Sequence, residues 1–264
     1  MNRRAFFNTV AVAAVASASP LQAKLLKYAG ELDSSSVKLD SSNDVIVRGR
    51  EYNNLVGLSE KIRRVRSIVG FGNFNLVGFD EMRKIGRSYS KVGKFTAVED
   101  DMFERIFYEN ANKYGFYGEK LLSNHTDNVF KEDTTKVKGT GHYIYKGKPT
   151  RIYSQIKDVM GDGVILTSGV RGIVKQMDLF LRKTVRCHGN VSAASYSLAP
   201  AGYSYHSIGD FDIGKVGWGH RNFTEDFATT DEYKKLKDLG YLQIRYTQDN
   251  PYGVRYEPWH VKVV

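Results

Sequence analysis

The chain has 264 residues, and its 39 lysines and arginines against 29 acidic residues give a formal net charge of +10. Its single cysteine, Cys187, excludes an internal disulfide and a cysteine-rich structural zinc site, so a hydrophobic core must supply the stability. A basic chain suits polyanionic partners. Its basic residues are scattered, however, and do not alternate with stacking aromatic side chains as in single-strand binders, so we expect no nucleic-acid partner.

The first 23 residues have the pattern of an export signal. Arg3 and Arg4 form a basic start, residues 10–18 are small and apolar, and residues 20–23 resemble a cleavage site. The stretch is too short to span a membrane stably. The paired arginines fit a twin-arginine signal, and an ordinary secretory signal is the alternative. We expect an exported protein, periplasmic or associated with the cell wall, with no stable membrane anchor after signal removal.

Residues 24–44 are rich in serine and aspartate without periodicity, which indicates a flexible lead-in. Residues 45–135 show helical patterns and no catalytic cluster. Thr96 and Glu99 form a capping box that opens a helix, which we expect to end near Lys113. Apolar spacing predicts further helices at residues 58–69 and 79–85. We therefore predict a helical amino-terminal region.

Residues 136–264 combine short apolar runs with helical patterns, which indicates an α+β fold with a small antiparallel sheet and flanking helices. The last two strands should form a closing hairpin. The predicted strands are one in the 140s and residues 163–167, 211–216, 242–247 and 259–264, and the predicted helices are residues 172–186 and 230–239.

Two segments near the end of the chain carry metal-binding chemistry. His206 and Asp212 lie in a Ser-Tyr-His-Ser-Ile-Gly-Asp-Phe-Asp-Ile-Gly stretch, and His260 ends a Tyr-Glu-Pro-Trp-His stretch. Two neutral imidazoles and one carboxylate are the protein ligands of a catalytic zinc site, whose fourth position is left open for water. A general base must still take the proton of that water, and Glu257 is the natural candidate. Pro258 disfavours a helix, so we expect Glu257 and His260 on extended chain.

Rival residues lie near this set. Asp210 precedes Asp212 by two residues and offers a second carboxylate. His142 lies at the start of an alternating strand, from which it can line a cleft without binding metal. His220 follows the predicted 211–216 strand in a loop and is a rival ligand.

A third block, Ile-Leu-Thr-Ser-Gly-Val-Arg, ends at Arg171 and precedes Gln176. Arg171 stands where a predicted strand turns into a predicted helix. Elements on both sides fix the backbone at such a turn, which suits a guanidinium that must reach a carboxylate.

These three ordered motifs, within roughly residues 160–264, resemble the zinc D-alanyl-D-alanine carboxypeptidases, which include the VanY-type vancomycin-resistance enzymes. The chain departs from the family at two places. The family usually has its aspartate seven residues after the first histidine, whereas Asp212 follows His206 by six. Val170 stands where the family often has tyrosine. Ile213 and Gly214 match the family residues after the aspartate, which favours Asp212 over Asp210 as ligand.

The resemblance implies a zinc peptidase that acts on peptidoglycan stem peptides, with His206, Asp212 and His260 as ligands and Glu257 as base. It also implies that Arg171, Gln176 and the serine matched by Ser204 hold the substrate's terminal carboxylate and polarised carbonyl. Residues 136–264 would then be the catalytic domain.

Two other functions stay open. An exported zinc endopeptidase would cut cross-links with the same site, and a non-catalytic cell-wall binding module would keep only the fold and groove. The motifs do not separate D,D from L,D specificity. They do not reveal an oligomeric state, and oxygen and nitrogen ligands admit several first-row metals besides zinc.

Overall fold

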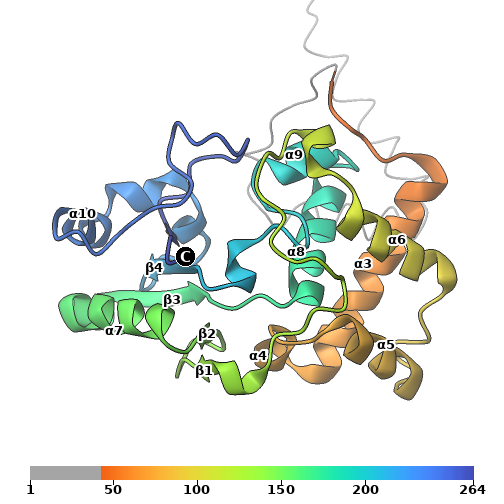
Figure 1. Ribbon diagram of the computed structural model, residues 1–264, viewed down its shortest axis with the longest axis horizontal. Helices are drawn as coiled ribbons and strands as arrows, with labels where there is room; N and C mark the ends of the chain where they lie inside the picture. Colours follow the sequence, from red (N-terminus) through yellow and green to blue (C-terminus); the bar gives the residue numbers. More distant parts are fainter. Residues whose placement is uncertain (1–42) are drawn as a thin grey trace, which may run out of the picture. The chain divides into compact units, whose positions relative to one another are not determined.

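The computed structural model describes residues 43–264 (Figure 1). The predicted export signal and nearly all of the predicted lead-in lie outside the described residues. Within the described part, no helix combines the length and apolar character needed to cross a membrane.

Helices dominate the first part of the described chain, as predicted. The capping box is present: Thr96 accepts a hydrogen bond from the Glu99 backbone, and Glu99 accepts one from the Thr96 backbone at 2.8 Å. The helix ends at Tyr108 rather than near Lys113, because Asn110 caps a separate 3₁₀ turn there. The helices are α3 (Gly49–Val69), α4 (Phe71–Phe74), α5 (Phe79–Ser88) and α6 (Ala97–Tyr108), with 3₁₀ turns at Ala111–Tyr114 and Lys131–Asp133.

The predicted helix at 172–186 is α8 (Ile173–Arg186), and it packs against α3 (Figure 1). Its apolar face shares one hydrophobic core with α3, α5 and α6, so the predicted amino-terminal region and the predicted catalytic region are joined through this helix. Buried members of this core include Leu58, Ile62, Phe103, Phe107, Val174, Met177 and Leu181.

The main sheet has the order β3–β4–β5 and is antiparallel throughout. Its strands are β3 (Val164–Ser168), β4 (Phe211–Lys215) and β5 (His260–Val261). Two predictions about this sheet were wrong. The strand in the 140s is β2 (Tyr143–Tyr145), and it pairs instead with β1 (Thr134–Lys136), because glycines with positive φ at 139 and 141 reverse the chain between them. Residues 242–247 form no strand, and the predicted hairpin is reduced to one bridge between Ile244 and Val261.

Helices α7 (Lys148–Met160), α9 (Val191–Ser195) and α10 (Asp231–Asp238) complete the described elements. The helix α10 begins at a Thr230 cap, close to the prediction. The helix α7 was not predicted, although Pro149 in its first turn is a common start signal. Ile152, Ile156 and Met160 recur at helical spacing along it and pack on the core that lies against the sheet.

Candidate metal centre

The register of the main sheet brings two of the candidate ligands, Asp212 and His260, together. Asp212 lies on the central strand β4 and is paired with His260 on β5 and with Ser168 on β3. Residues directly opposite each other on neighbouring antiparallel strands have side chains on the same face, about 5 Å apart. Strand pairing therefore places His260 beside Asp212, although 48 positions separate them in the sequence.

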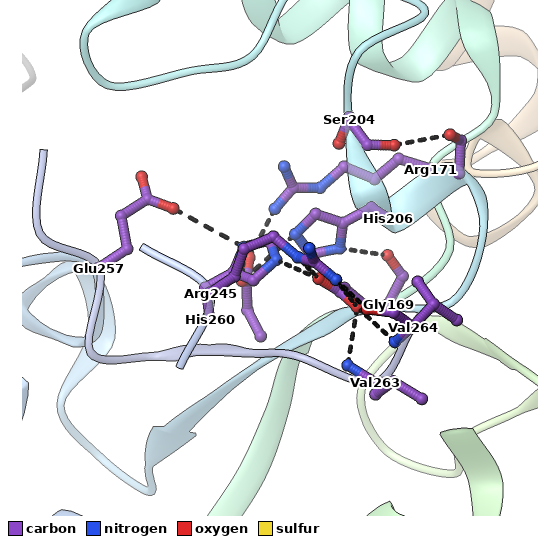
Figure 2. A network of polar contacts seen from close by, with 12 residues as sticks. Gly169, Arg171, Ser204, His206, Arg245, Glu257, His260, Val263 and Val264 are labelled. Atoms are coloured by element: carbon purple, nitrogen blue, oxygen red, sulfur yellow. Dashed lines mark hydrogen bonds and ion pairs between the residues drawn. The ribbon is translucent and has the colours of Figure 1, made fainter. Parts of the chain in front are cut away.

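His206 reaches the same place from a 3₁₀ turn, Tyr205–Ser207. Its backbone carbonyl accepts a hydrogen bond from the Arg171 N–H at 3.3 Å, and its ring Nδ1 lies 2.8 Å from the carbonyl oxygen of Gly169 (Figure 2). Glycine is required at 169, because a Cβ there would lie 1.9 Å from the carbonyl oxygen of Tyr143. The segment after β3 thus holds the ring so that Nδ1 donates to Gly169 and Nε2 faces Asp212.

One ligand atom from each of His206, Asp212 and His260 lies within 4.8 Å of the other two. Oδ1 of Asp212 is 3.3 Å from Nε2 of His206 and 3.4 Å from Nδ1 of His260. Ligands about 2.0–2.1 Å from a tetrahedral metal would be separated by about 3.3 Å, so both spacings fit a zinc ion.

Hydrogen bonding gives the same result. Among the described residues, Nε2 of His206 and Oδ1 of Asp212 are buried without a hydrogen-bond partner, because their 3.3 Å approach lacks hydrogen-bond geometry. Buried polar atoms are normally satisfied, since leaving one unpaired costs about 1–3 kcal/mol. A cation that accepts both lone pairs would remove this cost, so the donor set fits a metal.

The other carboxylate oxygen of Asp212 is held by Arg171. Nη2 of Arg171 lies 2.5 Å from Oδ2 of Asp212, and Nε of Arg171 donates to Oγ of Ser168 at 2.8 Å. Arg171 follows β3 and precedes α8, at the strand-to-helix turn that the sequence predicts. Its guanidinium therefore orients Asp212 from the side opposite the two imidazoles.

Nearby charges and burial shift the pKa values of the three candidate ligands in different directions. Burial and the nearby Arg171 lower the pKa of His206 to about 4, which keeps its ring neutral. Burial raises the pKa of Asp212, but His206 and Arg171 outweigh it and the pKa falls to about 2. Burial lowers the pKa of His260, but the hydrogen bond to Asp210 and the negative charges of Asp212, Asp210 and Glu257 together outweigh burial, so the pKa is raised.

Glu257 stands beside the three ligand atoms. Residues 257–260 form a turn in which the His260 N–H donates to the Glu257 carbonyl at 3.1 Å. His260 itself lies on strand β5, as the prediction of extended chain requires, and the turn at residues 258–259 interrupts the extended chain between it and Glu257. Proline is favoured at the second position of such turns, which Pro258 occupies. The turn leaves Oε2 of Glu257 3.7 Å from Nδ1 of His260. Burial raises the pKa of Glu257 to about 7, against the opposing effect of His260 and Arg255.

Asp210 lies next to this group without facing the ligand atoms. Its Oδ2 is 3.0 Å from Nε2 of His260, on the far side of that ring from Asp212. Asp210 also accepts hydrogen bonds from Arg245 and from the backbone of Val263 (Figure 2). From the sequence, Asp210 is only a rival ligand and Arg245 has no role, although an arginine between the apolar residues of 241–246 is a signal for a buried partner.

The structure also places the remaining candidates. Nε2 of Gln176 donates to the Ala199 carbonyl at 2.6 Å, and Ser204 is buried one residue before the 3₁₀ turn. His142 is buried with its ring 5.1 Å from that of Phe71, and burial lowers its pKa to about 4. His220 is exposed. Cys187 is buried, and burial raises its pKa.

Comparison with known proteins gives the following matches. Residues 154–264 match the sequence model of the VanY family, described as D-alanyl-D-alanine carboxypeptidase. No curated protein matches the chain.

Several solved structures are similar. The vancomycin-resistance D,D-pentapeptidase VanY of the VanB-type cassette, a mutant in complex with Zn(II), is 24% identical with a TM-score of 0.41, over 50% of this chain and 78% of that chain. VanYB in complex with D-alanine-D-alanine is 23% identical with a TM-score of 0.43, over 57% and 86% of the two chains. The LD-carboxypeptidase LdcB is 21% identical with a TM-score of 0.40, over 57% and 71%.

Proposed function

We propose that this protein removes the terminal D-alanine from peptidoglycan stem peptides, because residues 154–264 match the sequence model of the VanY family, described as D-alanyl-D-alanine carboxypeptidase. In this proposal His206, Asp212 and His260 hold a zinc ion. The observation that carries it is the convergence of two imidazole nitrogens and one carboxylate oxygen, within 4.8 Å, beside the buried Glu257.

Zinc, when bound, supplies the Lewis acidity that polarises the scissile carbonyl and acidifies the attacking water. The protein's own residues prepare the site for it. Nδ1 of His206 is hydrogen-bonded to Gly169, and Nε2 of His260 is hydrogen-bonded to Asp210. Oδ2 of Asp212 accepts a hydrogen bond from Arg171. The atoms that face one another, Nε2 of His206, Nδ1 of His260 and Oδ1 of Asp212, are thereby left free to act as ligands.

Glu257 moves the proton. Its carboxylate takes a proton from the attacking water and then delivers it to the nitrogen of the departing D-alanine. A group that must both accept and donate works best with a pKa near the working pH, and burial raises the pKa of Glu257 to about 7.

Arg171, Gln176 and Ser204 are proposed to bind the substrate's terminal carboxylate and carbonyl. A guanidinium has five N–H donors. Among the described residues, Arg171 donates from Nε to Ser168 and from Nη2 to Asp212, which leaves donors for a substrate. One guanidinium would then join the substrate to Asp212.

The other expectations from the sequence become part of this proposal. Residues 136–264 form the catalytic domain, and residues 45–135 form a helical support that packs on it. Residues 1–23 direct export, so that the enzyme meets its substrate in the periplasm or at the cell wall.

The test uses the purified mature chain, its metal content and a digest of isolated peptidoglycan. We expect about one zinc per chain and muropeptides that lose one D-alanine each, read by mass spectrometry. The variant Glu257→Gln should keep the zinc and lose roughly two to four orders of magnitude in rate, the usual effect of removing a general base. Parental rates in this variant would exclude the mechanism.

The same digest separates the alternatives. An endopeptidase would convert cross-linked dimers to monomers, and a binding module would leave all products unchanged while sedimenting with the cell wall. Synthetic stem peptides that end in D-Ala-D-Ala or in an L,D bond decide between D,D and L,D specificity.

A further inference from the structure

Asp210 lies at the centre of a buried network next to the proposed metal ligands. Only 1% of its surface is exposed. Oδ1 accepts hydrogen bonds from the backbone N–H groups of Val263 at 2.8 Å and Val264 at 3.3 Å, and from Nη2 of Arg245 at 3.3 Å. Oδ2 accepts from Nε of Arg245 and contacts Nε2 of His260 at 3.0 Å. Both oxygens are fully engaged, so Asp210 has no lone pair to offer a metal.

Arg245 holds this carboxylate from the other side. Its guanidinium lies over the ring of Tyr205, with Cζ 3.4 Å from the ring centroid, and it also donates to the carbonyl of Val264 (Figure 2). Tyr205 is the residue before His206. The pair of Asp210 and Arg245 therefore connects the turn that carries one proposed ligand to the strand that carries another.

Stability alone does not account for this pair. Removing two charges from water costs several kcal/mol each, so a buried ion pair often contributes nothing net compared with apolar residues of similar size. An apolar core lies close by, as Phe211 and Val261 on the neighbouring strand positions are fully buried. A role in orienting a neighbour is the better explanation.

The neighbour with two distinguishable states is His260. A neutral imidazole donates from one nitrogen and accepts at the other, and the partner of one nitrogen decides which is free to bind a metal. Asp210 accepts from Nε2, so Nδ1 carries the lone pair and faces Oδ1 of Asp212 at 3.4 Å. The rings of His206 and Tyr246, with centroids 4.8 and 4.9 Å away, restrict rotation but do not select a nitrogen.

We propose that Asp210, held by Arg245, is a positioning residue that fixes His260 with Nδ1 as its metal-binding atom. The inference rests on the proposed metal site and deepens it, since it assigns the second carboxylate of the Asp-Phe-Asp segment to the imidazole rather than to the metal. Asp212 is the ligand, and Asp210 orients a ligand.

The test is zinc affinity, measured by competition with a chromophoric chelator on the full mature chain. In Asp210→Asn an amide N–H₂ replaces one acceptor and meets either Arg245 or the Nε2–H of His260, so the ring loses its fixed orientation. We expect affinity to fall about 10- to 100-fold, the usual effect of losing such a partner. The kcat of zinc-saturated enzyme should fall while KM changes little, and the visible spectrum of the cobalt-substituted protein should change.

A second variant covers the case in which Asp210→Asn does not fold. Arg245→Lys keeps the charge but loses the bidentate hydrogen bonding to Asp210. We expect zinc affinity to fall about 3- to 10-fold, less than in Asp210→Asn because Asp210 is still present. The matched control is Glu99→Gln, which breaks the remote ion pair of Lys61 and Glu99 and should leave zinc affinity unchanged.

The outcomes separate the two proposals. If the parent binds no zinc, the proposed function fails and this inference fails with it. If the parent binds zinc and cleaves stem peptides, but the folded variants at 210 and 245 bind zinc as tightly as the parent, only the positioning role is wrong.

Discussion

The interior around α3, α6 and α8 differs in kind from the interior around β4. In the helical core, fully buried side chains such as Phe103, Phe107 and Leu58 pack on one another, and the ion pair of Lys61 and Glu99 lies at its edge. Around β4, by contrast, Asp210, Asp212 and the two histidines are almost completely buried.

The apolar interior is what folding requires, whereas the charged interior around β4 is better explained by function. Apolar burial stabilises a fold without further conditions, at about 25 cal/mol per Å². Buried charges cost free energy unless each finds a partner, so they accumulate where a function needs them. The following experiments test whether the two interiors respond as this view requires.

The largest effect is expected from loss of a proposed metal ligand. His206→Ala should lower the rate of D-alanine release by about 10³-fold or more, equivalent to about 4 kcal/mol in the activation free energy. A chelator should lower the melting temperature of the parent, since a ligand that binds only the folded state stabilises it by mass action. The melting temperature of the variant should not respond to the chelator, and an equal response in both would contradict the assignment.

The helical core should show the opposite pattern. Phe103 is fully buried on α6, and its ring centroid lies 4.9 Å from that of Phe79. Phe103→Ala should lower the free energy of unfolding by about 3–5 kcal/mol and leave zinc affinity unchanged. Val98→Ala, at an exposed position on the same helix, is the control and should change stability by less than about 0.5 kcal/mol. A large change in zinc affinity in the folded Phe103 variant would show that the two interiors are coupled.

Lys175 is an exception within the helical region. It is buried beside the rings of Phe71 and Phe74, and burial lowers its pKa to about 8, from an ordinary value of 10.5. The folded state therefore disfavours the charged amine, and this penalty is present below pH 8 and disappears as the pH rises towards 10.5. Lys175→Met should raise the free energy of unfolding at pH 7 by about 1–3 kcal/mol.

The pH dependence provides the check on this prediction. Denaturant unfolding of parent and variant at several pH values should show a stability difference that shrinks between pH 8 and 10.5. A difference that stays constant with pH would mean that packing, and not the charge, accounts for the gain.

The smallest effect concerns the start of α6. Thr96→Ala removes the side-chain half of the capping box and should cost about 1 kcal/mol. Thr96→Ser keeps the hydroxyl and should restore most of the loss, and neither variant should alter zinc affinity. Equal stability of the alanine and serine variants would contradict a capping role.

The sequence was informative where local chemistry decides the structure. Thr96 and Glu99 determine a helix start from within one turn, and the apolar spacing along α8 defines its buried face. The helix α7 has comparable signals in Pro149 and in its apolar spacing, so it too could have been predicted from the sequence.

Pairing partners were harder to predict. Nothing local specifies that the strand in the 140s pairs with β1, or that residues 242–247 form only a single bridge. For the site, the ordered motifs named the residues that converge. Asp212 was chosen over Asp210 from the family resemblance of Ile213 and Gly214, because the two aspartates have the same chemical type. The contacts of Asp210 with Arg245 and His260 connect positions 35 and 50 residues apart and depend on the tertiary fold.

Asp212 is paired with Ser168 on one side and His260 on the other, so the register of β4 fixes which face its carboxylate points to. Side chains alternate between the two faces of a strand, so a shift of β4 by one residue against β5 would turn the carboxylate away and present Phe211 or Ile213 in its place. The glycine at 209, with φ of 149°, makes the compressed path between turn and strand accessible. The register of β4 against its two neighbours thus decides which side chain reaches the two histidines.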